Sequence, residues 1–113
     1  MECVERESQS ERYIVARDSG RIVGVVSVSG EKITKLYVSP DRTSEGIGRS
    51  LYEAAEAAIR AEGLGRVILG AFSSAVPFYE RMGLSPAGRK AASGPLAGLS
   101  ITLMERTLTP EAG

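Results

Sequence analysis

Two glycines beside the predicted start of a helix are the part of this sequence best suited to chemistry. Gly46 and Gly48 follow a strand-like segment, residues 33–38, and precede an alanine-rich segment. Glycine lets the backbone approach a ligand closely, and the first N–H groups of a helix have no partner inside the helix. The pattern therefore predicts a turn that binds an anion, favoured by the positive end of the helix dipole. Considered alone, the same glycines also fit a tight turn that binds nothing.

The composition excludes several other kinds of site. The 113 residues contain no histidine and one cysteine, Cys3, which excludes an internal disulfide, a histidine base and a cysteine zinc site. The carboxylates do not cluster, so we expect no metal. Fourteen basic and fourteen acidic residues cancel, which argues against a nucleic-acid partner. Without an apolar run near the ~20 residues of a membrane helix, and with a polar start unlike a signal peptide, we expect a cytoplasmic protein and no membrane partner.

The hydrophobic pattern predicts one α+β domain over residues 1–113, with a loose N-terminus at 1–11 and a C-terminal tail at 109–113. Three strands joined by tight turns, followed by a strand-helix-strand crossover, indicate a mixed, mostly antiparallel sheet with helices packed on it. The predicted strands cover residues 13–16, 22–28, 32–38, 67–69, 84–89 and 101–108, and the predicted helices cover residues 47–62 and 75–82.

Three segments of the chain resemble the GNAT family, the Gcn5-related N-acetyltransferases. Residues 36–40 (Leu-Tyr-Val-Ser-Pro), with Gly46-Ile47-Gly48 after them, resemble the acetyl-coenzyme A signature of that family. Residues 75–84 (Ala-Val-Pro-Phe-Tyr-Glu-Arg-Met-Gly-Leu) resemble its second signature, and residues 101–108 resemble its last strand. The resemblance covers residues 12–108 and implies a minimal version of the acyl-CoA N-acyltransferase fold.

The resemblance also implies a reaction and a site. Acetyl-coenzyme A, the co-substrate, would lie in a V-shaped split between the strand ending at Val38 and the strand ending near Gly70. Tyr79 would be the general acid that protonates the departing thiolate, and the amine of an unidentified small molecule or peptide would attack the thioester directly. The cofactor-binding residues would be Leu36, Tyr37 and Val38 along the pantetheine, Thr43, Ser44, Glu45, Gly46, Ile47, Gly48, Arg49 and Ser50 around the pyrophosphate, and Ser74 on the pantetheine side.

The sequence departs from the family pattern at several of these positions. Thr43 stands where arginine or glutamine is usual, and Glu45 brings a carboxylate toward the pyrophosphate, so Arg42 or Arg49 would have to supply a cation. Ser74 replaces an asparagine, although both are good helix N-caps. The strand before Pro40 offers no glutamate in the position of a base, so the sequence identifies no general base.

The N-terminal region is also shorter than is usual in the family, which begins with a strand and two helices. We therefore expect an unpaired sheet edge and an uncovered apolar face, and we predict a homodimer in which a second copy covers them. A second function stays open: the chain could be a non-catalytic module that binds coenzyme A, or a regulatory or structural module with the same fold. In that case Tyr79 would be a half-buried packing residue. We expect Tyr37 and Tyr52 to pack, and Phe72 and Phe78 to lie in the core.

Overall fold

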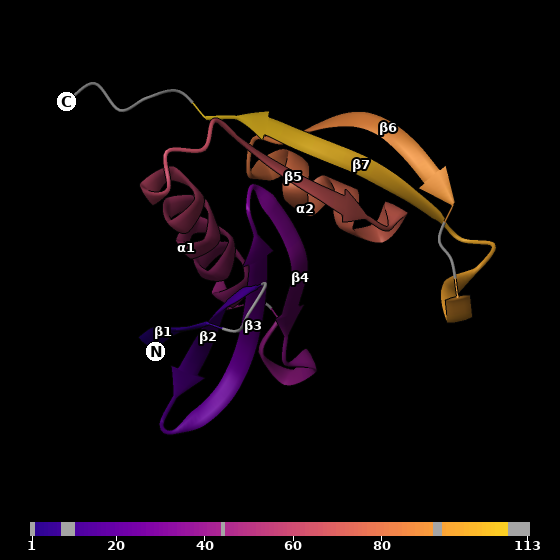
Figure 1. Cartoon of the computed structure of the whole chain (residues 1–113). Coiled ribbons are helices and arrows are strands. Elements are labelled where there is room, and N and C mark those ends of the chain that lie inside the picture. Colours follow the sequence, from indigo (N-terminus) through magenta and orange to yellow (C-terminus); the bar gives the residue numbers. More distant parts are fainter. Residues whose placement is uncertain (1, 8–10, 44, 92–93, 109–113) are drawn as a thin grey trace.

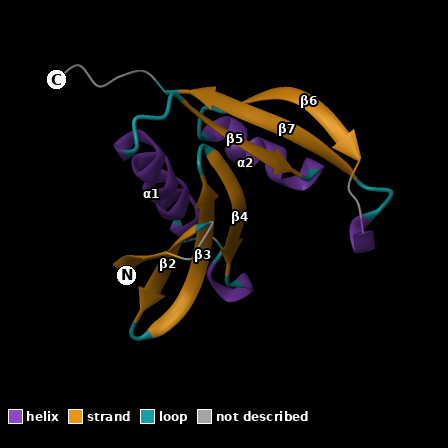
Figure 2. Ribbon diagram, in the orientation of Figure 1, coloured by secondary structure: helices purple, strands orange, loops and turns teal. Residues whose placement is uncertain are grey.

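The computed structural model describes residues 2–7, 11–43, 45–91 and 94–108. These residues form a seven-stranded sheet in the order β1-β2-β3-β4-β5-β7-β6, with two α-helices and three short 3-10 turns (Figures 1 and 2). The strands are β1 Glu2–Glu7, β2 Arg12–Asp18, β3 Arg21–Ser29, β4 Lys32–Val38, β5 Arg66–Ala71, β6 Ser85–Ala91 and β7 Ser100–Thr107. The helices are α1 Ile47–Ala61 and α2 Val76–Arg81, and the 3-10 turns are η1 Pro40–Arg42, η2 Ser73–Ala75 and η3 Gly94–Leu96.

The predicted mixed sheet is confirmed. All neighbouring strands pair antiparallel except β4 and β5, which run parallel and are connected through α1. The turn between β2 and β3 uses Ser19 and Gly20, both with positive φ, as tight hairpins require. No helix among the described residues has the length and apolar character needed to cross a membrane.

The prediction of a loose N-terminus is wrong for β1. Glu2–Glu7 pairs antiparallel with β2 along its whole length, with Val4 opposite Val15. A strand therefore does precede β2, contrary to the expectation that this element is missing. Backbone hydrogen bonds to a neighbouring strand need few apolar side chains, and charged residues are common on sheet edges, so the charged composition was a poor guide. Residues 1, 8–10 and 109–113 lie outside the described part of the chain.

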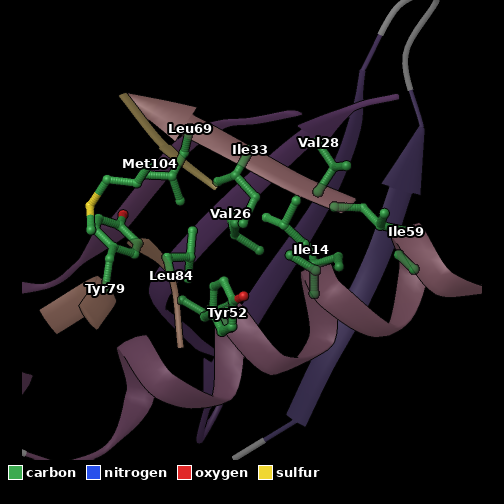
Figure 3. Packing of buried hydrophobic residues seen from close by; sticks show 14 of the residues in the cluster. Ile14, Val26, Val28, Ile33, Tyr52, Ile59, Leu69, Tyr79, Leu84 and Met104 are labelled. Carbon is green, nitrogen blue, oxygen red and sulfur yellow. The ribbon is translucent and has the colours of Figure 1, made fainter. Parts of the chain in front are cut away.

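Helix α1 covers the core side of β2, β3 and β4. The apolar side chains along one face of α1 are buried. Gly63 caps the C-terminal end of the helix, with a φ of 77° and an N–H that donates to the Arg60 carbonyl at 2.9 Å. Figure 3 shows the side chains that fill the space between helix and sheet. The buried residues contributed by α1 are Ile47, Leu51, Tyr52, Ala55, Ala58 and Ile59.

Gly24 lets α1 approach β3 closely. A Cβ at this position would lie 2.8 Å from Leu51 Cδ1 and 2.9 Å from the carbonyl oxygen of Tyr37. Both distances are shorter than a van der Waals contact, and the second atom belongs to backbone that cannot turn aside. The absence of a side chain at Gly24 therefore helps to set the height of α1, and of the turn that precedes it, above the sheet.

We predict that Gly24→Ala lowers the free energy of unfolding by roughly 1–3 kcal/mol, because a methyl group must be forced into a filled space. Chemical denaturation followed by circular dichroism measures the change. Gly65→Ala is the matched control, since no atom lies within 4 Å of its Cβ position. Equal stability of the two variants would contradict the close contact at Gly24.

Candidate active site

The sheet opens between β4 and β5. In the described chain these strands share a single Cα pair, Lys32 with Ile68, next to a hydrogen bond from the Ile68 N–H to the Glu31 carbonyl at 3.0 Å. Beyond that pair the strands diverge toward their C-terminal ends, as Figure 1 shows. The V-shaped split expected between them is therefore present, with its vertex at Lys32 and Ile68.

A β-bulge in β4 lies at this vertex. Ser27 of β3 faces Lys35, whereas the next residue, Val28, faces Ile33, so Thr34 is an extra residue in β4. Bulges bend a strand and increase its local twist. Because the bulge comes two residues after the last contact with β5, it explains why β4 stays paired with β3 while it leaves β5.

Two of the three predicted pantetheine contacts turn their backbone into the split. The Ser39 N–H donates to the Val23 carbonyl at 2.8 Å, so Ser39 faces β3. Backbone groups alternate along a strand, which places the N–H and C=O of Tyr37 toward β3 and those of Leu36 and Val38 toward the split. The Tyr37 side chain is 54% exposed, so the expectation that it packs is wrong.

The two glycines of the predicted anion turn do different things. Gly46 is the N-cap of α1 with φ 79°, and no atom lies within 4 Å of its Cβ position, so the space in front of it is open. The Ser50 N–H donates to the Gly46 carbonyl at 3.1 Å. The N–H groups before Ser50, in the first turn of the helix, have no partner within the helix. Gly48 instead packs on Phe78 of α2, whose ring lies 3.4 Å from its Cβ position.

Arg42 neutralises the carboxylate of Glu45. Its Nε donates to Glu45 at 2.7 Å and its Nη2 to Asp18 at 2.5 Å. The hydrogen bond from Arg42 lowers the pKa of Asp18, and the bond to Asp18 raises the pKa of Arg42. Arg42 is thus engaged by two carboxylates, and the charge of Glu45 is paired.

Arg49 is a second positively charged side chain near the turn. It pairs with Glu53 at 3.3 Å, and its side chain is 69% exposed, an arrangement of little stability that leaves it able to move. Thr43 is exposed next to the turn, and Ser44 lies outside the described residues. The N–H of Ser50 is already used within the helix, as given above.

Tyr79 is more deeply buried than the half-buried packing residue of the alternative prediction. It is 9% exposed, and its ring meets that of Phe78 edge to face with centroids 5.1 Å apart. Figure 3 shows Tyr79 in the part of the core that also contains Leu84 and Met104. Burial raises the pKa of its phenol, so the hydroxyl is protonated at neutral pH and can donate a proton.

The predicted cap of the second helix is wrong. Ser74 lies inside η2, and the N-cap of α2 is Ala75, without a side-chain hydrogen bond. Phe72 is 40% exposed rather than in the core, since it follows the last residue of β5 and leaves the buried side of the sheet. Tyr52 is buried, and Phe78 packs against the core, as predicted.

A carboxylate that the sequence did not single out lies at the bulge. Thr34 donates its hydroxyl to Glu11 at 3.1 Å, and Ser27, which is fully buried, lies 2.7 Å from Thr34. Because the Thr34 proton goes to Glu11, the Ser27 hydroxyl donates to Thr34. Glu11 stands 23 residues before Thr34, in a charged segment predicted to be loose, so no spacing rule pointed to this contact.

Comparison with known proteins places these features in a family. The chain matches the acetyltransferase (GNAT) domain over residues 1–108. It is 32% identical over 77 residues to YjaB, a peptidyl-lysine N-acetyltransferase of Salmonella typhimurium, with 68% of this chain and 52% of that protein covered. The chain therefore aligns with about half the length of this curated relative.

Solved structures show the same arrangement of strands and helices. A GCN5-related N-acetyltransferase from Rhodopseudomonas palustris superposes with a TM-score of 0.83 at 28% identity, covering 87% of this chain and 62% of that one. An aminoglycoside 6′-N-acetyltransferase complexed with coenzyme A has the same fold, with a TM-score of 0.76 at 16% identity over 93% of this chain and 77% of its own. With the family match over residues 1–108, these findings show that the chain belongs to the GNAT acetyltransferase family and has the acyl-CoA N-acyltransferase fold.

Proposed function

We propose that this protein transfers an acetyl group from acetyl-coenzyme A to the amine of an acceptor. The observation that carries the proposal is the split between β4 and β5, whose inner edge offers the backbone of Leu36 and Val38. An extended pantetheine arm can pair with such an edge as an added strand would. Acetyl-coenzyme A, when bound there, supplies an acetyl group activated as a thioester.

The turn before α1 suits the pyrophosphate of that cofactor. Open space in front of Gly46 and the unpaired N–H groups of the first helical turn form a site for an anion. Arg49 adds a mobile cation, and Arg42 removes the obstacle that Glu45 would present. Thr43, Ser44 and Ser74 stay predicted contacts.

Two groups of this chain can manage the protons of the reaction. Tyr79 holds a phenolic proton that it can give to the departing thiolate. Because a phenol is a weaker acid than a thiol by roughly 1.5 pKa units, the transfer depends on close placement. Glu11, which contacts Thr34 at the bulge of β4, can accept the proton that the attacking amine loses. The cytoplasmic location also stays a prediction.

We predict that Tyr79→Phe lowers kcat by about 10²- to 10⁴-fold while the dissociation constant for acetyl-coenzyme A stays the same, because only the proton donor is removed. Turnover with an amine panel and titration calorimetry measure the two quantities. Tyr52→Phe is the control, since it removes the hydroxyl of another buried tyrosine, which has no assigned role in the reaction. An unchanged kcat would remove Tyr79 from the mechanism.

Wild-type calorimetry also separates this function from the second candidate. Binding of acetyl-coenzyme A with turnover of at least one amine supports the proposal. Binding without turnover of any amine supports a coenzyme-A-binding module, a possibility favoured by the engagement of Arg42 with Asp18 and Glu45. The absence of binding at millimolar ligand supports a purely structural or regulatory role.

We predict that Glu11→Gln lowers kcat/KM at neutral pH by about 10²-fold or more, because the amine then loses its proton without a base. The defect should shrink as the pH approaches the pKa of the acceptor amine, since a neutral amine needs less assistance. Glu80→Gln, which removes an exposed carboxylate on α2, is the control. A defect of equal size at every pH would indicate a structural role for Glu11.

The protein is proposed to act as a homodimer. Val25 lies next to Gly24, which faces α1, so the row Val4, Val15, Val25 and Tyr37 crosses β1 to β4 on the face away from that helix. Light scattering at micromolar concentration should give twice the chain mass of 12.0 kDa. A mass of one chain under these conditions would contradict the dimer.

A further inference from the structure

A pocket of about 300 Å³ lies on the sheet beside the vertex of the split. Lys32 and Ile68, the one pair that joins β4 to β5, are part of its wall. On β5 and β7, Val67, Leu69 and Met104 point into the core, so their neighbours Ile68 and Leu103 point to the opposite face. The lining residues on this outer face are Lys32, Arg66, Ile68, Gly70, Lys90, Leu103 and Glu105.

The charged side chains at the rim of this pocket, together with Glu31, carry three positive and two negative charges, an excess of one positive charge. Arg66 is balanced by Glu31 at 2.9 Å and by Glu105 at 3.5 Å. Lys32 and Lys90 have no acidic partner among the described side chains, and both are exposed. They come from β4 and β6, 58 positions apart in the chain, and the tertiary structure brings them to one pocket with an apolar floor.

We propose that this pocket binds the carboxylate of the acceptor, and that the acceptor is an amino acid or a peptide end with a carboxylate near its reactive amine. The inference rests on the function proposed above. The volume suits one residue rather than a macromolecule. Lys32 and Lys90 attract the carboxylate, whereas Ile68 and Leu103 contact the apolar part of the same molecule.

The position of the pocket relative to Glu11 fits this orientation. Lys32 and Thr34 are two residues apart in β4, about 7 Å along a strand, and Thr34 holds Glu11. In the proposed orientation the carboxylate of the acceptor lies at the lysines and its amine lies on the Glu11 side of the pocket. The positive rim also lowers the pKa of a nearby ammonium group and increases the fraction of neutral, nucleophilic amine.

The test compares two probes that differ only in charge, N-acetyl-L-leucine and N-acetyl-L-leucinamide. Neither has a free amine, so binding is measured apart from turnover, by amide chemical shifts of the full chain at low salt. We expect the acid to shift the signals of residues 66–70 and 103–105 and to bind at least tenfold more tightly than the amide. The double variant Lys32→Gln/Lys90→Gln should lose this preference, and Lys35→Gln, on β4 but outside the pocket, should keep it.

The outcomes separate this inference from the proposed function. Equal binding of the two probes, no binding of either, or a preference that survives in the double variant overturns the carboxylate site. Titration of acetyl-coenzyme A on the same sample is independent of these results. Binding of acetyl-coenzyme A without a preference for the acid overturns only the acceptor assignment, whereas preference for the acid without acetyl-coenzyme A binding overturns the acetyl transfer and leaves the carboxylate site.

Discussion

The separation of β4 from β5 is the constraint on which the rest of this structure depends. A continuous sheet would pair every backbone group of β4, yet the extra residue at Thr34 bends the strand away after one contact. Buried backbone groups without partners are costly, and the open edge at Leu36 and Val38 is therefore where we propose that the pantetheine pairs. The residue inserted at the bulge, Thr34, also contacts Ser27 and Glu11, so one irregularity accompanies both the opening of the sheet and the contact with this carboxylate.

The elements on the core side of the sheet are tied together by a charged cluster. Glu56 of α1 accepts hydrogen bonds from Arg60 at 3.2 Å and from Arg106 of β7 at 3.1 Å. Arg106 also donates to the carbonyl of Met82, at the end of α2, at 2.8 Å. The cluster therefore connects the helix that carries the glycine turn, the helix that carries Tyr79 and a strand of the sheet. Through this cluster α1, which packs on β4, is joined to β7, which pairs with β5.

The zero net charge of the chain conceals strong local fields. Near the turn before α1, Arg42 is held by two carboxylates, so the charge of Glu45, the residue before Gly46, is paired. On the outer face, the lysines of β4 and β6 have no acidic partner among the described side chains and line a pocket with an apolar floor. A sum of charges cannot report either arrangement, because the contact of Arg42 with Asp18 and the shared pocket of the two lysines depend on how distant strands are placed.

Local pattern in the sequence was sufficient for most of the fold. The strand 32–38 was predicted with the bounds of β4, the helix 47–62 ends at its glycine cap, and the resemblance to the GNAT family follows from short motifs. These features depend on residues close in sequence, whose periodicity and turn preferences act before the chain folds. The charged strand β1 and the 3-10 turn at Ser74 escaped the same reasoning, since backbone pairing and local packing outweighed composition there.

Only the tertiary structure decided how the site is completed. The contacts Arg42 with Asp18, Thr34 with Glu11, and the meeting of Lys32 with Lys90 each join residues 23 or more positions apart. Their geometry follows from strand order and from the bulge in β4, which no pattern of neighbouring residues specifies. The sequence by itself therefore determined the family and the position of the glycine turn, and it pointed to Tyr79 as the candidate general acid. The link between Arg42 and Asp18, the contact of Glu11 with Thr34 and the positive pocket arise from long-range pairing of the sheet.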